Sequence, residues 1–80
     1  MDDAEILQRI GELVDEEHKL LKKAEEEGLT DEERGRMKEL EIRLDQCWDL
    51  LRQRRARRHA HLNPDEAQPR DPRIVEHYLQ

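Results

Sequence analysis

The chain has 80 residues, of which 45% are charged and 34% hydrophobic, and its formal net charge at pH 7 is −6. A chain of this length buries only about 60% of the surface that its unfolded form exposes, which excludes a large core and more than one domain. The composition is typical of long amphipathic helices and excludes a β-sandwich or barrel, while the negative charge disfavours binding to nucleic acid or membranes by charge alone.

The first predicted helix runs from residue 2 to about residue 27. Its apolar residues recur at spacings of three and four, which places them on one helical face. One row within this face, Leu7, Val14 and Leu21, repeats every seven residues. The apolar positions are Ile6, Leu7, Ile10, Leu13, Val14, Leu20, Leu21 and Ala24. A stripe this wide suits packing against more than one neighbour.

A turn follows at Gly28, because glycine readily adopts the left-handed conformation that ends many helices. Thr30 and Glu33 have the spacing of a capping box, and three acids occupy the turn where a helix dipole favours them. The sequence therefore predicts a second helix from Asp31 to about His59. The link is so short that the two helices must be antiparallel.

The second helix carries its own apolar face, which should meet that of the first. Its members are Met37, Leu40, Leu44, Cys47, Trp48 and Leu51. With the centre of the turn near Gly28, the expected facing pairs are Leu20 with Met37, Leu13 with Leu44, and Ile6 with Leu51. The predicted fold is thus an all-α antiparallel hairpin over residues 1–62.

Residues 63–80 read as a proline-containing linker and a short C-terminal helix. Asn63 and Pro64 are suited to the N-cap and first position of a short turn. Asp71 and Pro72 would cap a last helix over residues 73–79, which either docks or stays mobile. We expect the hairpin to fold without the residues after Asn63.

Two helices alone cover such a stripe only partly, which leaves a lone hairpin marginally stable. We therefore expect a homodimer, with two hairpins paired into a four-helix bundle. Trp48 is expected to be the large anchor of the core or of the dimer seam; the alternative is an exposed contact for an unidentified protein partner. The candidate interface residues are Leu13, Leu20, Leu44, Trp48 and Leu51.

Glu17 is a candidate buried polar residue, because it lies near the centre of the first apolar stripe. A buried carboxylate requires a partner, so we expect Glu17 to fix the helix register through an arginine or the Trp48 indole. The alternative is a metal-dependent helical-bundle enzyme with Glu17, His18 and Glu41 as ligands. The spacing disfavours it, because Asp15, three residues before His18, points away from the stripe.

Five arginines and no acid lie between residues 52 and 58. Antiparallel geometry places them beside the acidic N-terminal residues, and they complement the dipole of the helix end, so a structural role is expected. The alternative is a nucleic-acid or polyanion binder with strongly salt-dependent affinity. The candidate anion-binding residues are Arg52, Arg54, Arg55, Arg57 and Arg58.

The single cysteine, Cys47, cannot form an intrachain disulfide and is expected to pack as a small hydrophobe. We find no constellation of catalytic side chains, and expect neither an enzyme nor a cofactor. The N-terminal residues are acidic where a signal peptide is basic, and no apolar run approaches the ~20 residues of a membrane span. We therefore expect a cytoplasmic protein that does not engage membranes.

Two segments resemble a known family. They are GLTDEER at residues 28–34 and, more specifically, LDQCWDLLRQRRA at residues 44–56. These resemble the short bacterial proteins grouped as domain of unknown function family 2630, and the resemblance extends to VEHY at residues 75–78. It implies a stand-alone cytosolic helical protein without an established activity. The function we expect is that of a non-enzymatic interaction or structural protein that self-associates.

Overall fold

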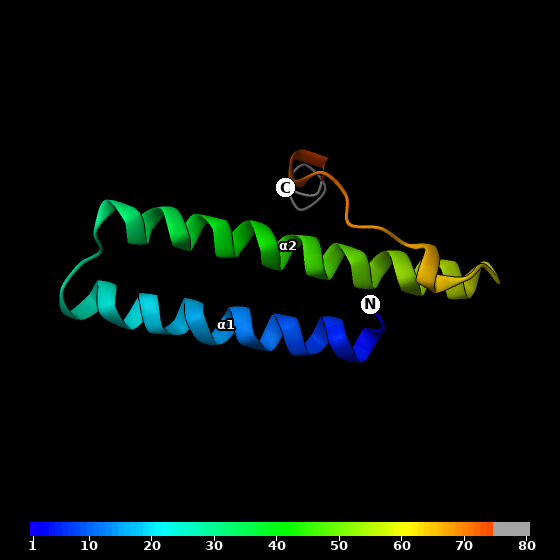
Figure 1. The fold of residues 1–80 in the computed structure, drawn as a ribbon, viewed down its shortest axis with the longest axis horizontal. Coiled ribbons are helices and arrows are strands. Elements are labelled where there is room, and N and C mark those ends of the chain that lie inside the picture. The colour runs from blue at the N-terminus through cyan, green and yellow to red at the C-terminus, as the bar shows by residue number, and fades with distance from the viewer. Residues whose placement is uncertain (75–80) are drawn as a thin grey trace.

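The computed structural model describes residues 1–74 as two long helices and a C-terminal segment. Helix α1 spans Asp3–Glu26, helix α2 spans Asp31–His59, and a 3-10 helix, η1, spans Pro64–Glu66. The long helices lie side by side and antiparallel, and the chain after η1 runs back along α2 (Figure 1). The all-α hairpin is confirmed, and its pairing into a bundle stays a prediction.

The helix ends follow local sequence signals. Thr30 accepts a hydrogen bond from the Glu33 amide at 3.1 Å, and the Glu33 carboxylate accepts one from the Thr30 amide at 3.0 Å, which is the predicted capping box. A second capping box, formed by Asp2 and Glu5, begins α1 and was missed in the sequence. Asn63 caps η1 as predicted. Residues 72–74 begin the predicted last helix, and the rest of it lies outside the described residues.

We expect opposite effects from alanine at two glycines. Gly28 has a φ of +80° whereas Gly35 lies within α2, and an added Cβ would meet nothing within 4 Å at either. Only backbone preference therefore counts. Gly28→Ala should lower the free energy of unfolding by about 1 kcal/mol, since the left-handed region penalises a Cβ. Gly35→Ala should raise it by about 1 kcal/mol through helix propensity. Urea denaturation measures both, and changes of the same sign would contradict this account.

The core lies mainly between the two long helices. Its buried apolar residues are Ile6, Ile10, Leu13, Leu40, Leu44 and Leu50. Ion pairs at the two ends match the predicted register, since Asp3 meets Arg54 and Lys23 meets Glu33, each at 2.5 Å. Of the two roles predicted for Trp48, an anchor of the hairpin core is wrong, and an anchor of a dimer seam stays a prediction. Its side chain is 47% exposed, and Leu50, which was not predicted, is buried instead.

Candidate functional site

The hairpin has two chemically different flanks. Charged residues of α1 repeat every seven positions at Arg9, Glu16 and Lys23, which places them on one side of the helix. On this side Glu16 pairs with Arg36 of α2, and Lys23 pairs with Glu33. We call this side the charged flank, defined by Arg9, Glu16, Lys23, Arg36 and Arg43.

The opposite side of the hairpin is apolar. Leu7, Val14 and Leu21 each precede a member of the charged row by two residues, which is about 200° around a helix. On α2, Leu50 follows Arg36 and Arg43 at the same seven-residue spacing and so lies on their side of the helix. Trp48 precedes Leu50 by two residues and therefore lies on the opposite side, with the apolar row of α1. We call Leu7, Val14, Leu21 and Trp48 the apolar flank. Leu7 is 52% exposed and Leu21 48% exposed. Side chains of this kind on one face form a patch that suits a partner.

The predicted interface residues divide between the core and this flank. Leu13 and Leu44 are buried between the helices of the same chain, and Leu20 and Leu51 are half-buried there. Only Trp48 of the five is largely open to a partner. The seven-residue repeat of Leu7, Val14 and Leu21 was the signal that could have identified the other two exposed members, Leu7 and Leu21.

Asp49 is a fully buried carboxylate that the sequence did not single out. Arg70 donates two hydrogen bonds to it, one from Nε at 2.8 Å, and Gln53 donates another at 3.0 Å. Arg52 lies 3.7 Å away. The Arg70 guanidinium holds the pKa of Asp49 below its usual range against the opposing effect of burial. Arg70 therefore neutralises a charge that would otherwise be costly inside the protein.

Arg54 joins three parts of the chain. It is 5% exposed and donates hydrogen bonds to Asp3 at 2.5 Å, to Asp65 at 3.0 Å and to the Pro64 carbonyl at 3.2 Å. The arginines lie beside the acidic N-terminal residues as predicted, since Arg58 also contacts Asp3 at 3.0 Å. Buried and paired with both Asp3 and Asp65, Arg54 is not placed to meet an external anion.

The other predicted anion-binding residues differ in their surroundings. Arg57 contacts Glu66 at 3.5 Å, and Arg52 contacts Asp49. Arg55 is exposed and forms no ion pair with a residue that the structure describes. The other four arginines are each paired with an acid of this chain, which neutralises positive charge that binding to a polyanion would require.

Side chains of α2 hold residues 63–70, which we call the returning segment. Gln46 donates a hydrogen bond to the Arg70 carbonyl at 3.2 Å, and Gln53 donates one to the Gln68 carbonyl at 2.8 Å. Ala67 packs against the core. The α2 side chains that hold this segment, Gln46, Asp49, Gln53 and Arg54, all belong to residues 44–56, the stretch with the most specific sequence signature. That signature therefore encodes the attachment of the returning segment.

Acid is expected to weaken the hairpin through Glu33. Hydrogen bonds from Lys23 and from the Thr30 amide lower the pKa of Glu33 to about 2. A lowered pKa contributes stability that is complete above the unfolded value, about 4.3, and is lost as the pH falls towards 2. Circular dichroism melts between pH 5 and 2 should show a smaller fall in Tm for Glu33→Gln than for the wild type. Glu25→Gln, which removes no described ion pair, is the control and should follow the wild type.

Glu17 does not occupy the predicted buried position. It is only partly buried and forms no hydrogen bond or ion pair with the described residues, so the expected arginine or Trp48 partner is not found among them. Within residues 1–74, no cluster of three or more histidine, cysteine, aspartate or glutamate side chains is arranged to hold a metal ion. No helix of that described part combines the length and the apolar character needed to cross a bilayer.

Comparison with known proteins places the sequence among uncharacterised relatives. The model of a family described as protein of unknown function (DUF2630) matches residues 2–80. Uncharacterized proteins of Mycobacterium bovis and Mycobacterium tuberculosis are 46% identical over 77 residues, which covers 95% of this chain and 88% of theirs. No solved structure matches the sequence.

Proposed function

The chain belongs to the DUF2630 family of proteins of unknown function, and we propose that it is a non-enzymatic interaction protein that works as a pair of hairpins joined through the apolar flank. A cytoplasmic location is part of the proposal. The observation that supports it most directly is the half-exposure of Leu7, Leu21 and Trp48 on one side of the hairpin. On the opposite side, ion pairs join the two helices between Glu16 and Arg36 and between Lys23 and Glu33.

The apolar flank is complementary to itself. Leu7 and Leu21 are equally distant from Val14 along α1, so a two-fold axis near Val14 would bring Leu7 of each copy against Leu21 of the other. Closed two-fold pairs of this kind are the commonest assemblies of identical chains. A second copy therefore fits this surface better than an unrelated partner, which would have to match the same spacing.

The available area also suits a dimer. A helix of the 24 residues of α1 is about 36 Å long, and two helices side by side are about 20 Å wide. The whole side of the hairpin that carries the apolar flank therefore measures roughly 700 Å² per copy, close to the ~800 Å² per partner of a standard specific interface.

The mass in solution tests this proposal. Sedimentation velocity at several concentrations should give a dimer for the wild type. The double variant Leu7→Glu, Leu21→Glu should sediment as a helical monomer, because it buries four carboxylates in the proposed seam. Leu62→Glu is the matched control, since Leu62 is 55% exposed and lies outside the flank.

Two outcomes would overturn the proposal. One is a wild-type monomer at every concentration, and the other is a double variant that still dimerises. A species that carries nucleic acid until the salt concentration is raised would instead favour the polyanion alternative.

A further inference from the structure

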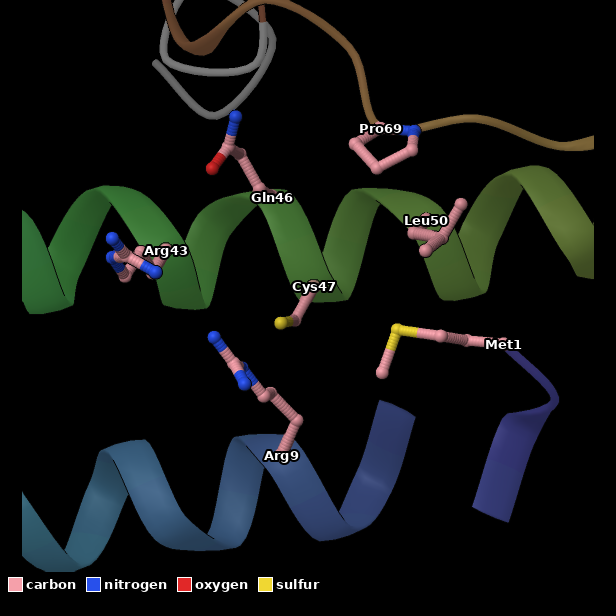
Figure 2. A pocket seen from close by; sticks show the side chains of 7 residues that line it. All are labelled: Met1, Arg9, Arg43, Gln46, Cys47, Leu50 and Pro69. Carbon is pink, nitrogen blue, oxygen red and sulfur yellow. The ribbon is translucent and has the colours of Figure 1, made fainter. Parts of the chain in front are cut away.

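A pocket of about 340 Å³ opens on the charged flank between α1, α2 and the returning segment (Figure 2). Its surface is mostly apolar and comes from all three parts of the chain. The lining residues are Met1, Arg9, Arg43, Gln46, Cys47, Leu50 and Pro69. Pockets that combine apolar walls with a few convergent polar groups are the usual sites for small ligands.

One end of this pocket is cationic. The Arg9 guanidinium rises from α1 beside the Cys47 sulfur, and Arg43 of α2 lines the same end of the pocket (Figure 2). Burial raises the pKa of the Cys47 thiol, and the charges of Arg9 and Arg43 oppose that rise.

The two arginines differ in the ion pairs that they already form. Arg43 contacts Glu39 at 2.7 Å. Arg9 forms no ion pair with any residue from 1 to 74, and its guanidinium is therefore the stronger candidate to meet an incoming anion.

We propose that this pocket binds a small organic acid, with its carboxylate between Arg9 and Arg43 and its aliphatic chain against Cys47, Leu50 and Pro69. Arginine is suited to this role because its planar fork can donate two parallel hydrogen bonds to one carboxylate. A volume of about 340 Å³ accommodates roughly ten groups the size of a water molecule. An acid of about eight carbons matches that size.

Acid binding in this pocket does not depend on self-association, because the pocket and the apolar flank lie on opposite sides of the hairpin. The protein can therefore bind the acid as a monomer, and it can dimerise without binding the acid. Cys47 also supplies a local reporter, since a chain lying over its sulfur must shield it from a thiol reagent.

Octanoate is the probe for the experiment. Titration calorimetry should give a Kd near 1 mM, an affinity in keeping with about ten non-hydrogen atoms. Saturating octanoate should slow alkylation of Cys47 by iodoacetamide, a neutral reagent, at least fivefold. Octanol has the same length without the charge and should bind at least tenfold more weakly.

Arg9→Gln is the decisive variant. Arg9 is exposed, so the hairpin should fold normally, while octanoate affinity should fall at least tenfold. The octanoate concentration that protects Cys47 fivefold in the wild type should then no longer do so in the variant. Arg34→Gln removes an exposed arginine near the turn and should change neither. Equal affinity of the wild type and Arg9→Gln, or of octanoate and octanol, would overturn the proposal. So would binding that leaves Cys47 unprotected, because the acid would then lie elsewhere.

Discussion

Leu40→Ala is expected to lower the free energy of unfolding by 2–5 kcal/mol, the usual cost of truncating a fully buried leucine. Leu40 has no exposed surface and lies in a core of few large side chains. A single core in a chain of this size rarely contributes more than about 3–5 kcal/mol of net stability. The variant should therefore be largely unfolded at room temperature, with a loss of helical circular dichroism.

Leu62→Ala is the control for this experiment. It makes the same substitution at a side chain that is 55% exposed and lies beyond the end of α2. Exposed positions of this kind usually change stability by less than about 0.5 kcal/mol. A folded Leu40→Ala with an unchanged urea midpoint would mean that the contacts between α1 and α2 are not the main source of stability.

Arg70→Ala is expected to cost about 3 kcal/mol at pH 7. Breaking a buried ion pair from one side costs about 3–5 kcal/mol, and the lower value applies because the Arg70 side chain is 36% exposed whereas that of Asp49 is 0% exposed. The returning segment can also lift away and let water reach Asp49. The loss is therefore limited to the stability that this segment contributes, which a chain ending at Asn63 would measure.

The pH dependence separates this mechanism from a general loss of packing. Because the folded pKa of Asp49 is lowered, the contribution of the pair is complete above the unfolded value, about 3.9, and disappears as the pH falls below it. The difference between wild type and Arg70→Ala should accordingly shrink in acid. Adding Asp49→Asn to Arg70→Ala should recover stability, and a double-mutant cycle measures the coupling.

Arg73→Ala provides the comparison, since the Arg73 side chain is 90% exposed and contacts only Asp71 among its ion pairs with described residues. It should leave the urea midpoint unchanged. If Arg70→Ala behaves like Arg73→Ala, the returning segment does not stabilise the hairpin. The expectation that residues after Asn63 are dispensable would then hold.

The helix boundaries and register could be predicted because the groups that determine them are close in sequence. Thr30 and Glu33 are three residues apart, and Gly28 ends α1 by its own backbone preference. The short link then forces the register of the two helices. Each of these signals acts within a few residues, so a single sequence contains it completely.

The candidate site was less predictable because α2 packs against two neighbours. Spacing identified the stripe that faces α1, but it could not reveal that Leu50 and Asp49 face the returning segment. Asp49 and Arg70 are 21 residues apart with a turn between them, and no periodic pattern links them. For the same reason the sequence could not decide whether Trp48 belongs to the hairpin core or to a dimer seam, because its position at the edge of the stripe gave no indication of which flank stays open.

Arg54 has a consequence for how the hairpin opens. In an isolated helical hairpin the end without a connecting loop frays first, and its amides exchange with solvent fastest. Here that end contains Arg54, bound to Asp3 near the start of the chain and to Asp65 after α2. Separating the helix ends must therefore also release the returning segment. The two ends of the described chain open as one cooperative unit, and the slowest hydrogen exchange should extend to the end opposite the loop.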